Sequence, residues 1–128
     1  MSSSKFSLRD RLRSFRYAFR GLFLLIKKEH NARIHLTVAI AAIALGILLK
    51  ITLTEWLFIT ILIGMVFTAE LINTSIEKLS DITDLDKNEK IRDIKDYAAA
   101  AVFISALISA IIGAIIFVPR VIEIMKSF

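Results

Sequence analysis

Three long apolar runs constrain the fold of this chain more than any other feature of its sequence. They cover residues 34–49, 56–72 and 97–118, and Glu70 is their only acidic or basic residue apart from His35. A helix of about 20 apolar residues crosses the ~30 Å hydrocarbon core of a bilayer. Because a membrane span must satisfy its backbone hydrogen bonds internally, each run is predicted to be a helix.

The composition agrees with a nearly loop-free helical membrane protein. Hydrophobic residues make up 56% of the chain, against about 45–50% in an ordinary soluble domain, and there are only four glycines and one proline. The sequence therefore predicts an all-α membrane protein with a single domain over residues 1–128. The predicted spans lie at about 34–50, 56–79 and 97–118, and Pro119 is expected to close the third span.

The segment before the first span, residues 6–28, is amphipathic. Large apolar side chains recur at spacings of three and four, with basic side chains between them. This pattern is typical of a helix lying at the membrane surface with its basic face toward anionic headgroups. The aromatic residues share the helical spacing of the aliphatic ones, which argues against a nucleic-acid partner. The apolar stripe includes Phe15, Phe19, Leu22 and Ile26, and the basic residues include Arg9, Arg13, Arg16, Arg20 and Lys27.

The distribution of positive charge predicts how the chain crosses the membrane. Of the 17 Lys and Arg residues, nine lie in residues 1–33 and five in residues 78–96, which leaves three for the opposite side. Loops rich in Lys and Arg remain in the cytoplasm. The N-terminus and the polar connector at residues 82–94 are therefore expected on the cytoplasmic side.

A stripe of polar side chains leaves the second apolar run at this cytoplasmic end. At about 100° per residue, its members fall within roughly a third of the helix circumference. A carboxylate inside the hydrocarbon costs on the order of 3 kcal/mol. Emergence of the helix into water explains Asp81, but explains Glu70 poorly because Leu71 and Ile72 keep the opposite face apolar. The sequence therefore predicts a functional site at the stripe, which consists of Glu70, Asn73, Thr74, Glu77 and Asp81.

The same end of the predicted bundle carries further polar residues, namely Glu29, Asn31, Arg33, Lys95 and Asp96. Carboxylates and amides, with two histidines and no cysteine in the chain, suit a hard cation such as Mg²⁺. Lysine and arginine suit phosphates. These groups are the ingredients of phosphoryl transfer, although the sequence contains neither a Walker loop nor the glycine-rich loop of protein kinases.

Two other classes of function compete with an enzyme. A small non-catalytic membrane protein, such as a lipid-binding or assembly subunit, could have the same spans. A transporter would need ionisable groups near the middle of the bilayer. The expected midpoints of the spans, near Ala42, Ile61 and Ser109, are uncharged, which disfavours a transporter.

The polar motifs resemble those of the small bacterial membrane lipid kinases, the diacylglycerol kinase and undecaprenol kinase family. The resemblance extends over about residues 15–118. Its most specific part is the acidic stripe, followed by a Lys-Asp pair and a helix rich in small residues. The matching motifs read Glu70-x-x-Asn73-x-x-x-Glu77-x-x-x-Asp81, Lys95-Asp96, Phe15-x-Tyr17-Ala18-x-x-Gly21 and Glu29-x-Asn31-x-x-Ile34-His35.

This resemblance implies ATP-dependent phosphorylation of a membrane lipid alcohol, diacylglycerol or undecaprenol, in the bacterial inner membrane. It implies a homotrimer that shares sites between subunits, and rows of small residues in the third span, such as Ser105, Ser109 and Gly113, suit close helix contacts. By resemblance, Glu70 is the general base and contacts the lipid with Arg33. The implied Mg²⁺ ligands are Glu29 and Glu77, and the implied nucleotide-binding residues are these two with Tyr17, Asn73, Lys95 and Asp96.

The chain also departs from the family pattern. Ala100 stands where the family often has a glycine, Tyr97 replaces a small aliphatic residue, and residues 86–88 lack a histidine that is common there. Ordinary structural roles are predicted for two residues, His35 as an interfacial histidine and Trp56 as an aromatic residue of the membrane interface.

Overall fold

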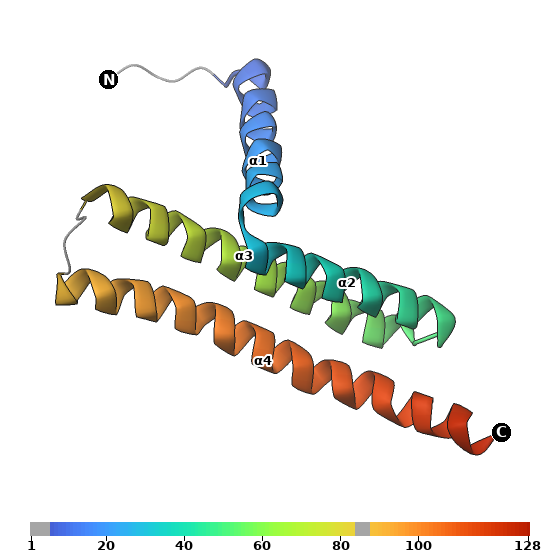
Figure 1. Cartoon of the computed structure of the whole chain (residues 1–128). Coiled ribbons are helices and arrows are strands. Elements are labelled where there is room, and N and C mark those ends of the chain that lie inside the picture. The colour runs from blue at the N-terminus through green and yellow to red at the C-terminus, as the bar shows by residue number, and fades with distance from the viewer. Residues whose placement is uncertain (1–5, 84–87) are drawn as a thin grey trace.

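The computed structural model describes residues 6–83 and 88–128, and these form four helices (Figure 1). Three of them are long and apolar enough to cross a membrane and follow a first, amphipathic helix, which confirms the predicted fold class. The described segments contain no strand. The helices are α1 (Leu8–Lys28), α2 (His30–Leu48), α3 (Leu53–Thr83) and α4 (Glu89–Lys126).

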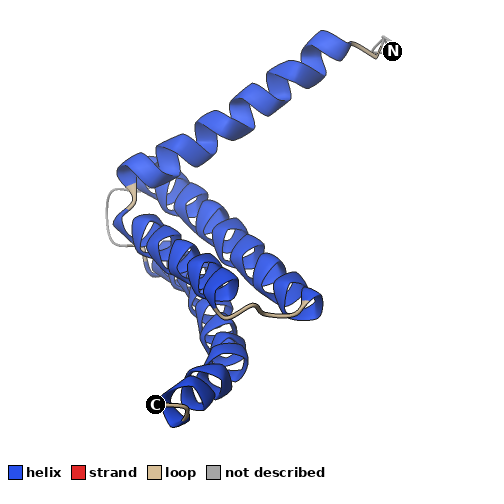
Figure 2. Cartoon of the chain, turned by 90° about the vertical axis from the view of Figure 1, so that its right-hand side faces the viewer, coloured by secondary structure: helices blue, strands red, loops and turns tan. Residues whose placement is uncertain are grey.

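Helices α2, α3 and α4 lie side by side, and α1 projects away from them at the start of α2, partway along α3 (Figures 1 and 2). The corner between α1 and α2 is a single residue, Glu29, whose extended backbone interrupts the helix. Leu25, in the last two turns, is the only buried residue of α1. The rest of α1 is therefore free to lay its apolar side against a bilayer.

The helices are longer than the apolar runs that predicted them. α2 begins at His30, before the first apolar run, and α4 begins at Glu89, before the third. α4 also continues through Pro119 to Lys126, although a proline removes one backbone donor inside a helix. The described part of the predicted connector is therefore mostly helical, and Asp86 and Lys87 lie outside the described residues.

The turn from α2 into α3 is built from local hydrogen bonds. Lys50 adopts a left-handed backbone conformation with φ of 50°, and the Ile51 N–H donates to the Gly46 carbonyl at 3.2 Å. This is the pattern of a Schellman cap at a helix C-terminus. Thr52 then caps α3, because its Oγ1 accepts from the Glu55 N–H while Glu55 Oε2 accepts from the Thr52 N–H.

The same end of the bundle is closed by side-chain packing. Gly46 lies against Trp56, and a Cβ atom at position 46 would be only 2.7 Å from Trp56 Cη2. Ile51, Ile59 and Ile116 form a buried cluster beside this contact. An ion pair from Arg120 on α4 to Glu55 on α3 fixes the register of these two helices. At 1.5 Å per residue, Glu55 lies about 22 Å along α3 from Glu70.

Candidate active site

The polar stripe on α3 passes from a buried to an exposed environment. Glu70 and Asn73 are 3% and 7% exposed, and Thr74 is also buried. Glu77, one turn further on, is partly buried, whereas Asp81 is exposed. Glu70 and Asn73 are therefore enclosed by protein, as the sequence predicted, and do not simply emerge into water.

Asn73 links the buried and exposed parts of the stripe. Its Nδ2 donates to Glu77 Oε1 at 3.2 Å, across one helical turn. Within the described part of the chain, the buried atoms Asn73 Oδ1 and Thr74 Oγ1 have no hydrogen-bond partner. Buried polar atoms are normally paired, so these oxygens are available to a ligand that the single chain does not provide.

The corner between α1 and α2 brings Glu29 to the stripe. Lys78 Nζ on α3 lies 3.4 Å from Glu29 Oε1. Glu77 lies one residue before Lys78 and two helical turns beyond Glu70 on the same face of α3. Three of the carboxylates that the sequence singled out therefore share one region.

Helix α4 contributes Lys95 to the same end of the bundle. Lys95 Nζ lies 3.0 Å from Asp81 Oδ1 on α3, across the α3–α4 interface. The neighbouring residue, Asp96, is exposed. Of the predicted Lys-Asp pair, only Lys95 has a described contact with the acidic stripe.

His35 on α2 is a member of the site whose role the sequence did not indicate. Its Nε2 lies 3.8 Å from Glu70 Oε2, and the side chains are 19% and 3% exposed. A signal was present, because His35 is the only ionisable group in the first apolar run and lies at its N-terminal end. The sequence could not show that His35 and Glu70 face each other.

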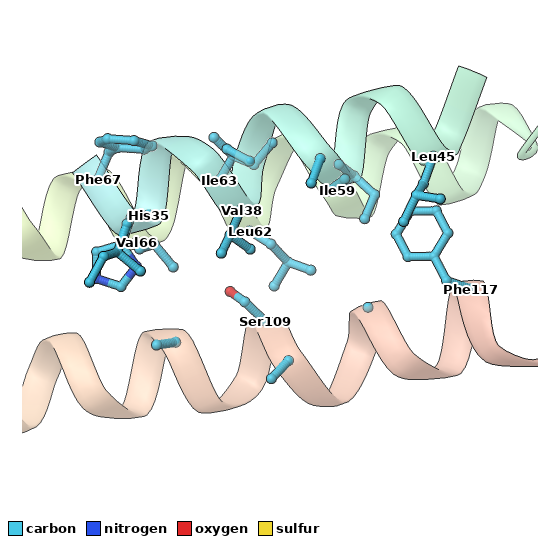
Figure 3. A pocket seen from close by; sticks show the side chains of 17 residues that line it. His35, Val38, Leu45, Ile59, Leu62, Ile63, Val66, Phe67, Ser109 and Phe117 are labelled. Carbon is cyan, nitrogen blue, oxygen red and sulfur yellow. The ribbon is translucent and has the colours of Figure 1, made fainter. Parts of the chain in front are cut away.

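An apolar cavity of about 500 Å³ lies between α2, α3 and α4 (Figure 3). His35 and Ser109 are the two polar side chains among the described residues that line it. The Ser109 hydroxyl donates to the carbonyl of Ser105 in its own helix, whereas His35 Nε2 lies 3.8 Å from Glu70 Oε2 on α3. Ser109 and Gly113, from the predicted small-residue rows, border this cavity within one chain.

Three predicted site residues are not brought to Glu70 within one chain. Tyr17 is 67% exposed on α1, twelve residues before the corner, where α1 has left the bundle (Figure 2). Arg33 is exposed and is offset by two residues, or about 200° of helix rotation, from His35. Arg33 therefore points away from Glu70, and Asp96 is exposed on α4.

The donor set near Glu70 fits a magnesium–nucleotide complex. In the described residues, no three His, Asp or Glu side chains converge as a metal cage. Proteins usually hold Mg²⁺ through one or two carboxylates together with the phosphates of the substrate. Glu29, Glu77 and the unpaired Asn73 Oδ1 are hard oxygen donors of this kind.

These features define a multi-pass helical membrane protein with a cluster of polar and acidic side chains beside an apolar cavity. The family model described as prokaryotic diacylglycerol kinase matches residues 16–117. The chain belongs to this family and is a lipid kinase, an enzyme that phosphorylates diacylglycerol or undecaprenol with ATP as the donor. The resemblance read from the motifs is confirmed, and the non-catalytic and transporter alternatives are set aside.

Two relatives support the family assignment. The chain is 38% identical to undecaprenol kinase of Bacillus subtilis over 108 residues, which cover 84% of this chain and 88% of that protein. It is 30% identical to diacylglycerol kinase of Synechocystis sp. over 113 residues, which cover 88% of this chain and 65% of that protein. No solved structure matches the chain significantly.

Proposed function

We propose that this lipid kinase transfers the γ-phosphoryl group of ATP to the hydroxyl of undecaprenol, with Glu70 as the general base. The observation that carries the proposal is the burial of the Glu70 carboxylate beside His35, a residue that also lines the apolar cavity. Undecaprenol is favoured because the match to undecaprenol kinase is higher and covers more of that relative than the match to diacylglycerol kinase does.

In this reaction Glu70 accepts the proton of the lipid hydroxyl as the alcohol oxygen forms its bond to the γ-phosphorus. The bond from that phosphorus to the bridging β–γ oxygen breaks, and ADP leaves. Positioned proton transfer of this kind contributes about 10²–10⁴-fold to a rate. Most of the remaining acceleration of phosphoryl transfer comes from positioning and charge neutralisation.

Glu29 and Glu77 are proposed to hold Mg²⁺, which would neutralise the phosphate charge when bound. Asn73 orients Glu77 through its hydrogen bond, and its buried Oδ1 has no partner among the described residues. Lys95 is proposed to bind the nucleotide by leaving its contact with Asp81 and contacting a phosphate oxygen. Tyr17 and Asp96 complete the proposed nucleotide site, and Arg33 is proposed to contact the lipid headgroup.

A homotrimer is proposed as the active form. Tyr17, Arg33 and Asp96 lie away from Glu70 within one chain, so their roles are best met when neighbouring subunits supply them. Large apolar side chains are exposed along α2 and α4, which leaves surface for both subunit contacts and lipid. The charge distribution supports a cytoplasmic N-terminus in the bacterial inner membrane.

The test uses the purified full-length chain in mixed micelles with labelled ATP and undecaprenol, diacylglycerol or ceramide. Undecaprenol is expected to give the highest kcat/KM, and Glu70→Gln to lower turnover by about 10²–10⁴-fold while Mg-ATP binding persists. Glu123→Gln, on the exposed end of α4, is the matched control. A preference for diacylglycerol would reassign the lipid, and near-normal turnover by Glu70→Gln would refute the base assignment.

A further inference from the structure

We propose that His35 is a positioning residue for Glu70, which holds the carboxylate in the orientation that proton transfer requires. This inference rests on the proposed role of Glu70 as the base. Its first observation is a contact between α2 and α3, in which His35 Nε2 lies 3.8 Å from Glu70 Oε2. In the part of the chain that the structure describes, His35 is the one basic side chain within ion-pair distance of Glu70.

The charges around Glu70 explain why it needs such a partner. Glu77 lies two turns beyond Glu70 on the same face of α3, and Lys78 holds Glu29 at the α1–α2 corner. An ionised carboxylate has no proton to donate, so neither of these side chains can hold the Glu70 carboxylate by a hydrogen bond. The His35 imidazole faces Glu70 from the α2 side, with Nε2 3.8 Å from Glu70 Oε2. On α4, Lys95 already pairs with Asp81, further along the stripe.

The position of His35 in the fold allows it to restrict the orientation of the Glu70 carboxylate. Its backbone belongs to α2, and its side chain forms part of the wall of the apolar cavity (Figure 3). A glutamate has three rotatable side-chain bonds, so a buried but untethered carboxylate can sample several orientations. Because catalytic geometry tolerates little displacement, a misplacement of about 1 Å can cost about 100-fold in rate.

The test compares two amides of different length at position 35. His35→Gln keeps an N–H donor at a reach similar to that of Nε2, whereas His35→Asn has the same amide on a shorter chain. His35→Asn is expected to lower kcat by about 10–100-fold, with the KM values for Mg-ATP and undecaprenol unchanged. His35→Gln is expected to recover most of the lost kcat. Thermal unfolding in detergent identifies any variant that fails to fold.

A double variant separates positioning from other roles. If His35 acts through Glu70, then His35→Asn combined with Glu70→Gln should be no slower than Glu70→Gln alone, because residues that act as a unit are not additive. A normal kcat for His35→Asn would overturn the inference. So would an effect confined to the KM for undecaprenol, which would make His35 only part of the cavity wall.

The two proposals fail in different ways. If Glu70→Gln retains turnover, the proposed base is wrong and the inference about His35 falls with it. If Glu70→Gln is inactive while His35→Asn is fully active, the base assignment survives and only the positioning role is lost. Equal losses of kcat in the two folded amide variants would also contradict the positioning role.

Discussion

Lys78 Nζ lies 3.4 Å from Glu29 Oε1, so a cation on α3 holds the carboxylate at the corner between α1 and α2. The Lys78 side chain is 58% exposed, and exposed ion pairs contribute only about 0–1 kcal/mol to stability. This contact therefore matters for the position of the Glu29 carboxylate more than for the stability of the fold. It holds Glu29 against α3 one residue beyond Glu77, and it leaves a lysine near the site proposed for the phosphates.

Replacement of Lys78 should affect nucleotide binding more than folding. Lys78→Met is expected to raise the KM for Mg-ATP by about tenfold, because a charge-assisted contact worth roughly 1.4 kcal/mol is lost. The unfolding temperature should remain the same within error. Steady-state kinetics at varied Mg-ATP measure the effect, with Lys126→Met on the exposed C-terminal turn of α4 as the control. An unchanged KM would remove Lys78 from the nucleotide site.

Glu77 and Asn73 should control the dependence on magnesium. Glu77→Gln is expected to raise the Mg²⁺ concentration for half-maximal activity by more than about tenfold, and Asn73→Ala to do so by about tenfold because Glu77 loses its orienting donor. Chelation of divalent cations should abolish turnover in the unmodified enzyme. Activity titrated with Mg²⁺ at fixed ATP provides the measurement. Identical titration curves for Glu77→Gln and the unmodified enzyme would exclude Glu77 as a ligand.

Gly46 should be required for the packing of the α2–α3 turn. Gly46→Ala is expected to destabilise the protein by about 1–3 kcal/mol, because the new methyl group meets the indole ring of Trp56 at 2.7 Å. Gly64→Ala is the matched control, since nothing lies within 4 Å of its added Cβ. The loss should shrink in a Trp56→Phe background, where the clashing ring atoms are absent. Thermal unfolding in detergent measures all of these variants.

The ion pair between Arg120 and Glu55 should stabilise the α3–α4 register without taking part in the reaction. Glu55→Gln and Arg120→Gln are each expected to lower the unfolding temperature. The double variant should lose less than the sum of the two, because each single change leaves a partly buried charge alone. Turnover per folded molecule should persist in all three variants. A fall in kcat without loss of stability would connect this end of the bundle to the chemistry.

The sequence located the helices well and their ends less well. Apolar run length and the thickness of a bilayer were enough to predict three spans. α2 and α4 both begin before these runs. α4 starts early because the Asn88 side chain caps its first turn and the negative charge of Glu89 is favourable near a helix N-terminus. Pro119 did not end α4, since one missing backbone donor leaves the hydrogen bonds on either side in place.

The sequence by itself also determined that Glu70, Asn73 and Glu77 share one face of a helix, because side-chain direction follows from the 3.6-residue period alone. Only the tertiary structure decided that His35 faces Glu70, that Lys78 reaches Glu29 and that Arg120 pairs with Glu55. These contacts depend on how each helix is rotated about its axis and shifted against its neighbours. Packing between helices sets this rotation and register. The periodicity of a single helix does not predict how the helix packs against its neighbours.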